Sequence, residues 1–161
     1  IGYESFPSDM STTNHIFFLN GIEFAPVYAR LMPILNNEVS PNRVSLLSPA
    51  PDITITRIDH RSFEMFIPTG WFERGAFATP PPKQFKVGQQ KTTPDFSAEV
   101  LAVTSDGQPS RVLYKMNHSL DHPDYRWMIW RGFHYEEIEF DFTIGESVFY
   151  SDPTLEMFQI Y

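Results

Sequence analysis

The sequence predicts a mainly β protein of the α+β class, built as an antiparallel β-sandwich or a small barrel-like module with one short N-terminal helix. Aromatic residues are abundant (15 Phe, 7 Tyr, 3 Trp) and favour the pleated surface of sheets. The 14 prolines, together with Asn-Gly and Asp-Gly pairs, separate short apolar runs, as turns separate strands. Only one stretch carries apolar residues at helical spacing.

Composition limits the classes of protein that this chain belongs to. With 161 residues, of which 42% are hydrophobic and 20% charged, it has the make-up of a folded globular protein rather than a disordered one. The net charge of −8 repels phosphate backbones, so nucleic acid is not an expected partner. The chain has no Cys, which excludes disulfides, thiolate nucleophiles and Cys-type zinc sites.

The first half predicts a strand, a helix and a second strand. His15 to Leu19 is a short apolar run that stops at Asn20-Gly21, as a buried strand does before a turn. Val44 to Leu47 predicts another strand. Between them, Pro33 falls inside the helical stretch, so we expect a short or kinked helix. The apolar residues at helical spacing are Phe24, Val27, Tyr28, Leu31, Ile34 and Leu35.

A β hairpin and a proline-rich connector follow. Residues 53–55 and 63–67 alternate between apolar and polar, and the polar residues 59–62 between them indicate a turn. Thr79 to Lys83 contains three prolines and predicts a stiff extended connector. We therefore expect a single domain, 1–161, with sub-segments 1–78 and 84–161 on either side of this connector.

The second half predicts an antiparallel module of two hairpins and a last strand at 146–150. Phe96 to Val103 and Arg111 to Met116 are joined by a turn that contains Asp106-Gly107. The second hairpin, from Tyr125 to Phe140, has two alternative registers. A two-residue Arg131-Gly132 loop would pair Trp130 with Phe133. We favour a three-residue loop, which places Trp127 and Ile129 beside Phe133 and Tyr135, because a positive φ at Arg131 would be strained.

A five-residue pattern occurs twice in this half, as FKVGQ at 85–89 and as FTIGE at 142–146. Each copy places an apolar pair before a glycine, which supplies a positive φ where a strand starts or bends. We expect the copies to mark the first and last strands of one module and to be neighbours in space.

The order of strand, short helix, hairpin and connector, followed by "FKVGQQ", "AEVLAVTSDGQPSRVLYKM", "HPDYRWMIWRGFHY" and "FTIGESVFY", resembles the extracytoplasmic C-terminal portion of large, uncharacterised bacterial multispan membrane proteins. The resemblance covers roughly residues 16–150. It implies a location outside the cytoplasmic membrane, with the membrane reached only through a segment outside this chain, and it implies no activity. The first residue is Ile1 rather than Met, as expected for a processed product or a piece of a longer protein.

The densest aromatic group of the sequence is the candidate binding surface. Rings at a surface stack on sugars or anchor a protein partner, and the same rings also pack the core of a small β module. On either register we expect at least one of Trp127 and Trp130 to be buried, and we expect Trp130 at the hairpin tip to be the exposed one. The candidate residues are Trp127, Trp130, Phe133 and Tyr135.

Two polar loops carry residue types that bind metals or transfer protons. His118, Asp121 and His122 lie close together in sequence and have donor atoms for zinc, although Pro123 argues against the helix that such spacing would need. Asp59-His60 has the composition of an orienting acid and a base. Both segments also suit ordinary turns, in which Asp, Asn, Ser and Pro are common. We therefore expect no metal and no cofactor.

These observations favour a non-catalytic, extracytoplasmic binding domain of a membrane-associated protein, with a protein partner. The first alternative is a carbohydrate-binding β module that uses surface aromatics. The second is a hydrolase that uses the Asp and His loops. The chain has no Gly-x-Ser-x-Gly elbow and no phosphate-binding glycine loop, which argues against the common hydrolase and nucleotide-dependent classes.

Overall fold

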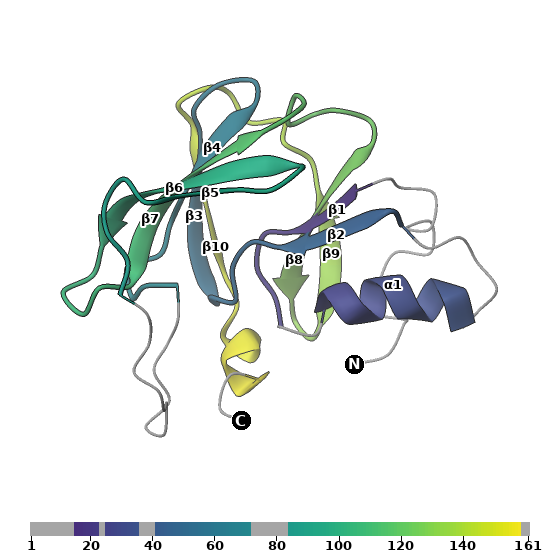
Figure 1. The fold of residues 1–161 in the computed structure, drawn as a ribbon. Coiled ribbons are helices and arrows are strands. Elements are labelled where there is room, and N and C mark those ends of the chain that lie inside the picture. Colours follow the sequence, from purple (N-terminus) through teal and green to yellow (C-terminus); the bar gives the residue numbers. More distant parts are fainter. Residues whose placement is uncertain (1–14, 23–24, 36–40, 72–83, 159–161) are drawn as a thin grey trace. The chain divides into compact units, whose positions relative to one another are not determined.

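The computed structural model describes residues 15–22, 25–35, 41–71 and 84–158 (Figure 1). Most of the regular structure is β, in two sheets with one α-helix near the N-terminus, which confirms the predicted fold class. Within these residues each sheet has two edge strands, so neither closes into a barrel.

Backbone contacts divide the chain into two compact units. The first unit comprises Ile1–Pro51, Asp121–Asp141 and Asp152–Tyr161, and the second comprises Asp52–Leu120 and Phe142–Ser151. Each unit contains one sheet.

The first unit has a mixed four-stranded sheet with the order β2-β1-β8-β9. β1 (His15–Phe18) runs parallel to both β2 (Arg43–Leu46) and β8 (Tyr125–Arg131). β9 (His134–Ile138) returns antiparallel to β8. Parallel neighbours need a crossover, and helix α1 (Ala25–Leu35) supplies it between β1 and β2. This sheet therefore departs from the purely antiparallel arrangement expected from the sequence.

Strand alternation divides the buried side chains of this sheet between its two faces. One face packs against the small residues Ala25 and Ala29 of α1 and against Leu155 of η3 (Pro153–Phe158); its buried strand residues are Ile16, Phe18, Met128, Trp130 and Tyr135. The other face is aromatic: the ring centroids of Phe17 and Trp127 are 4.6 Å apart, and those of Trp127 and Phe140 are 4.7 Å apart.

The second unit has a six-stranded antiparallel sheet with the order β10-β3-β4-β7-β6-β5. Its colours in Figure 1 run from blue to yellow, because the strands come from distant parts of the chain. The strands are β3 (Asp52–Arg57), β4 (Ser62–Phe66), β5 (Gln90–Thr92), β6 (Phe96–Val103), β7 (Pro109–Met116) and β10 (Ser147–Ser151).

The sheet order does not follow the predicted sub-segments 1–78 and 84–161. β3 and β4 precede the connector, but they pair with β10 and β7, which follow it. The chain passes between the units after Pro51, Leu120, Asp141 and Ser151, whereas the predicted connector at 79–83 lies outside the described residues. The predicted internal boundary thus separates strands that belong to one sheet.

The β8–β9 hairpin has a different register from the favoured one. Trp130 pairs with Tyr135, and the two-residue loop consists of Gly132 and Phe133, with φ of +54° and +70°. A type I′ turn requires positive φ at both central residues. The prediction of a three-residue loop was wrong because Phe133, rather than Arg131, adopts the left-handed conformation. Trp130 and Tyr135 thereby come to share the core face.

The repeated five-residue pattern forms the same turn twice. In each copy the N–H of the last residue donates to the carbonyl three residues earlier, at 3.1 Å for Gln89 and 3.0 Å for Glu146. Gly88 and Gly145 have φ of +85° and +88° at the third position, as in a type II turn. The turns lead into β5 and β10, which are opposite edges of one sheet. The expectation that the copies are neighbours in space was therefore wrong.

Candidate functional site

The aromatic group predicted as a binding surface is mostly buried. Trp130 is 1% exposed, Trp127 and Tyr135 are each 3% exposed, and Phe133 is 49% exposed. The expectation that Trp130 lies open at the hairpin tip was wrong, because the loop consists of residues 132–133 only, and Trp130 belongs to the core face. Phe133 is the member of the group that remains at the surface.

The buried Trp130 is held by polar contacts on both its main chain and its side chain. Its backbone N–H donates to Asn20 Oδ1 at 2.9 Å, and the Asn20 amide in turn donates to Ala50 O at 3.3 Å. Its indole Nε1 donates to Thr154 Oγ1 at 2.8 Å. Buried donors need such partners, so these contacts explain how a tryptophan next to a loop can be fully buried.

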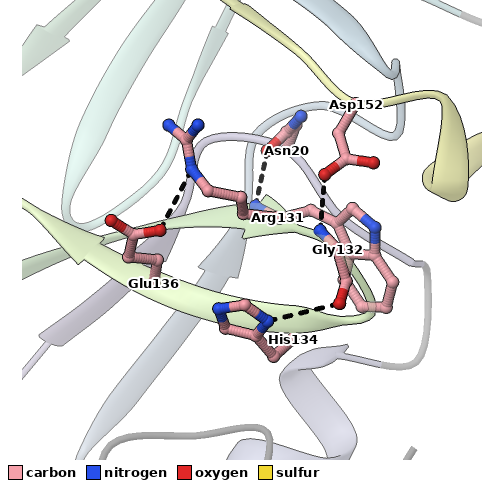
Figure 2. A network of polar contacts seen from close by, with 7 residues as sticks. Asn20, Arg131, Gly132, His134, Glu136 and Asp152 are labelled. Atoms are coloured by element: carbon pink, nitrogen blue, oxygen red, sulfur yellow. Dashed lines mark hydrogen bonds and ion pairs between the residues drawn. The ribbon is translucent and has the colours of Figure 1, made fainter.

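Figure 2 shows the contacts that hold the tip of this hairpin. Gly132 N–H donates to Asp152 Oδ2 at 2.5 Å, and His134 Nδ1 contacts Gly132 O at 3.3 Å. Arg131 Nε lies 3.0 Å from Glu136 Oε2, in an exposed ion pair. These polar side chains are paired with one another within the first unit, so we interpret the network as a structural clamp.

Asp152 is the charged member of this clamp. Burial tends to raise the pKa of its carboxyl, but hydrogen bonds from the Thr154 hydroxyl, from the N–H of Gly132 and from the N–H of Thr154, with the nearby charge of Arg131, lower it further. The net pKa is below the ordinary value. The carboxylate is therefore ionised at neutral pH and acts as a fixed acceptor.

The Asp59-His60 pair lies in the turn between β3 and β4. Asp59 Oδ1 accepts the N–H of Arg61 at 2.7 Å, and this backbone hydrogen bond is the main reason that its pKa is lowered. Ser119 Oγ donates to the carbonyl oxygen of His60 at 3.2 Å rather than to the imidazole. These contacts are those of a turn, and they do not form the base-to-nucleophile contact that the hydrolase hypothesis needs.

The candidate metal ligands lie in surface loops. His118 and Asp121 are exposed, and His122 is half-buried, with Nδ1 accepting the N–H of Asp124 at 3.2 Å. Among the described residues, no group of three or more His, Cys, Asp or Glu side chains is arranged to hold a metal ion.

A pocket of about 360 Å³ lies on one face of the sheet of the second unit. This volume falls in the range of small-molecule sites. The lining combines three aromatic rings, four small or branched apolar residues and three polar residues: Trp71, Phe85, Gln89, Gln90, Lys91, Ala98, Val100, Pro109, Val112 and Tyr114.

The sheet register builds the floor of the pocket. Ala98 pairs with Tyr114 and Val100 pairs with Val112, so these four side chains form two adjacent cross-strand rows on one face. The side chain of Ala98 is a single methyl group, so it leaves space beside the larger side chains of Val100, Val112 and Tyr114. A pocket near the β5 edge of this face thus coincides with one small residue in the register.

Two aromatic residues form the walls. Trp71 N–H donates to Pro109 O at 2.9 Å, and Phe85 N–H donates to Gly107 O at 2.9 Å, which holds both residues beside the start of β7. The Trp71 indole also hydrogen-bonds to the hydroxyl of Tyr114, whose pKa burial raises far above its ordinary value of 10.0. Tyr114 is therefore neutral at physiological pH.

The rim is polar and belongs to edge strand β5 and the turn before it. Gln90 and Lys91 are exposed, and Gln89 is half-buried. The Gln90 amide donates to Glu99 Oε2 at 3.1 Å, and Gln89 Oε1 accepts the N–H of Lys86 at 3.3 Å. The pocket therefore joins an apolar interior to polar residues of β5 and of the turn before it, and among them Lys91 lies on the same face as Ala98.

Gln108 is a buried polar side chain next to pocket residue Pro109. It is 1% exposed, and within the described part of the chain its amide nitrogen and oxygen have no hydrogen-bond partner. A Cβ added at Gly70 would lie 2.8 Å from Gln108 Cβ, so the two residues are tightly packed. An unsatisfied buried amide costs about 1–3 kcal/mol. A polar group that reached this amide would recover part of that loss.

The pocket residues did not stand out in the sequence. Trp71 lies outside the strands predicted from the sequence, and Ala98 is one residue of a predicted strand. The usable signal was the small residue opposite Tyr114 across the Asp-Gly hairpin, which predicts a gap on one face. Phe85 lay in the repeated pattern, which indicated backbone geometry rather than a ligand.

Comparisons with protein-family models, with curated proteins and with solved structures find no match to this chain. In the part of the chain that the structure describes, no helix combines the length and apolar character of a membrane span.

Proposed function

We propose that this chain is a non-catalytic binding domain that receives an apolar, ring-sized group of its partner in the pocket of the second unit. The observation that carries the proposal is the aromatic and aliphatic lining with a polar rim. Its one ionisable interior group, the Tyr114 phenol, has a pKa raised by burial, which suits a neutral hydrogen-bonding role better than proton transfer.

The partner that suits this pocket best is a protein or peptide that presents an aromatic or branched side chain next to a carboxylate. The apolar floor would hold the side chain, and Lys91 at the rim would attract the carboxylate. This anion preference is local, because the chain as a whole carries a charge of −8. The resemblance to extracytoplasmic portions of bacterial multispan membrane proteins supports a location outside the cytoplasm in a membrane-associated protein.

A carbohydrate ligand is the second candidate, and Gln89 at the rim favours it. Gln89 lines the pocket together with aromatic residues, a combination that binds sugar hydroxyls and the apolar face of a sugar ring. In this alternative the sugar-binding site is the pocket of the second unit rather than Trp130, which is buried.

A titration of the whole chain with small probes tests the proposal. Phenylacetate, benzyl alcohol, methyl glucoside and N-acetylglucosamine are added while backbone and indole N–H signals are followed by NMR. We expect phenylacetate to shift the signals of Trp71 and Val112, with a dissociation constant of about 1 mM or below. Lys91→Gln should weaken phenylacetate by roughly two- to fivefold and leave benzyl alcohol unchanged.

A pair of alanine variants provides the control. Ala98→Leu fills the pocket and should abolish binding, whereas Ala102→Leu makes the same change on β6 at a residue that does not line the pocket. Shifts caused by the sugars alone would favour the carbohydrate alternative. If no probe shifts pocket signals, or if Ala98→Leu binds as well as the native chain, the proposal is wrong.

A further inference from the structure

Among the strands that the structure describes, β10 forms an edge of the six-stranded sheet and is unlike the edge strand on the other side. It has five residues, Ser147–Ser151, with the sequence SVFYS and no charge or proline. The opposite edge, β5, has three residues and carries Lys91. Short length and lysine are common protections against edge-to-edge pairing. By these criteria β5 is protected and β10 is not.

The hydrogen bonds at both ends of β10 determine which of its main-chain groups point outward. Asp152 N–H donates to Pro51 O, and Glu146 O accepts the N–H of Arg57. In the register of β10 with β3, the even-numbered residues are therefore the ones whose main-chain groups hydrogen-bond to β3. Main-chain groups alternate along an antiparallel strand. The N–H and C=O groups of Ser147, Phe149 and Ser151 therefore face away from β3.

The outward-facing residues are arranged symmetrically about Phe149. Serine stands two positions before it and two positions after it. An antiparallel copy of the strand, centred on Phe149, would pair Ser147 with Ser151 and Phe149 with itself. In that register all three outward-facing residues form hydrogen-bonded pairs.

We propose that two copies of this chain associate through β10, with the strands antiparallel and Phe149 opposite Phe149 of the partner subunit. The contact joins the two sheets into one and obeys two-fold symmetry, which is the commonest symmetry of protein dimers. This inference is independent of the binding pocket, because no residue of β10 lines it.

The side chains of β10 suit this contact. Phe149 is 63% exposed, and cross-strand pairing with its symmetry mate would cover part of that ring. β10 itself has no charge, but in this register the flanking residues Glu146 and Asp152 lie opposite each other at both ends of the contact, and each chain carries −8 and repels a second copy at long range. Screening by salt removes this repulsion, so the dimer should form more readily at high ionic strength than at low.

Sedimentation equilibrium of the native chain measures the association directly. We expect the average mass to rise from 18.7 kDa towards twice that value as protein concentration increases, and to rise further at 500 mM than at 10 mM salt. Phe149→Lys places two like charges opposite each other and should weaken association by about tenfold or more. Val87→Lys makes the same change at a residue 64% exposed near the other edge, and it should leave association unchanged.

Single cysteines test the register, because the chain has no Cys of its own. Under mild oxidation, Phe149→Cys should form a covalent dimer readily, since paired residues lie within disulfide range. Ser147→Cys should not cross-link to itself, but it should cross-link to Ser151→Cys when the two variants are mixed. Val87→Cys is the exposed control.

Three results would overturn the inference. The first is a native chain that remains at 18.7 kDa at every protein concentration and salt condition. The second is a Phe149→Cys variant that oxidises no faster than Val87→Cys. A Ser147→Cys variant that cross-links to itself would also overturn it, because it would indicate parallel pairing or a different surface. Circular dichroism checks that each variant is folded, which we expect because residues 87, 147, 149 and 151 are exposed.

Discussion

At the tip of the β8–β9 hairpin, Trp130 has an environment opposite to the expected one, and Phe133 is the aromatic residue that lies at the surface. Trp130 is buried and hydrogen-bonded through both its nitrogens, whereas Phe133 is half-exposed with φ of +70°. Both outcomes follow from a two-residue loop at residues 132–133 in place of the three-residue loop that the sequence favoured. A bulky residue at positive φ is unfavourable, so the burial of Trp130 and Tyr135 outweighs that strain.

Asp152 provides a test of the clamp at the residue scale. Asp152→Asn removes the charge that accepts hydrogen bonds from Gly132 and Thr154, and we expect the free energy of unfolding at pH 7 to fall by about 1–2 kcal/mol. Urea denaturation followed by near-ultraviolet circular dichroism measures this change. Asp141→Asn, at an exposed residue, should stay within about 0.5 kcal/mol of the native chain.

The pH dependence of that difference follows from the lowered pKa of Asp152. A carboxyl whose pKa is lower in the folded chain than its ordinary 3.8 stabilises the fold fully above 3.8, and this contribution is lost as pH falls through the folded value. The native chain and Asp152→Asn should therefore differ at neutral pH and converge in acid. A difference that persists unchanged in strong acid would contradict this role.

At the scale of elements, helix α1 packs by a face that carries small residues and a proline. Ala25, Ala29 and Pro33 are buried, at spacings of four residues, whereas Val27 and Leu31 are 57% and 45% exposed. Small residues let the crossover helix approach the sheet closely. The apolar spacing predicted that a helix forms, but the identity of its buried face depended on its neighbours.

In the same way, the repeated five-residue pattern predicted the turn, but the strand beside which each copy lies depended on the pairing of the whole sheet.

The two type II turns provide a test at this scale. A Cβ at Gly88 or Gly145 would meet nothing within 4 Å, so substitution should disturb only the backbone. We expect Gly88→Ala and Gly145→Ala each to lower the free energy of unfolding by about 1 kcal/mol, because both glycines have positive φ.

Asparagine variants at the same positions serve as controls, since Asn tolerates the left-handed conformation better than Ala does. Chemical denaturation of the four variants measures the costs. Equal free energies of unfolding for the Ala and Asn variants would show that the positive φ of these glycines is not the cause of the lost stability.

At the scale of the whole molecule, neither sheet is formed by one continuous segment. The sheet of the second unit needs β10 from near the end of the chain, and the sheet of the first unit needs β1 and β2 from near its beginning. Long-range pairing of this kind is decided by which apolar faces can be buried together, and it leaves weak signals in local sequence.

The interleaved topology predicts how fragments behave. A fragment of residues 84–161, which a division at the connector would treat as a module, lacks β3 and β4, the partners of β10 and β7. We expect it to show no cooperative thermal transition by circular dichroism, in contrast to the full chain. A fragment that melts cooperatively, with native-like near-ultraviolet signals, would show that the sheet can form without those strands.

The sequence by itself determined the local structure of this protein. Alternating apolar residues, an Asp-Gly turn and two glycine turns identified the strands, the first hairpins and the mainly β class, because those patterns reflect backbone preferences within a few residues. Only the tertiary structure decided the parallel pairing of β1, the loop at Phe133 and the pocket between Trp71, Phe85 and the sheet. These features depend on contacts between residues far apart in the chain, where the choice is made by shared burial and hydrogen bonding rather than by local preference.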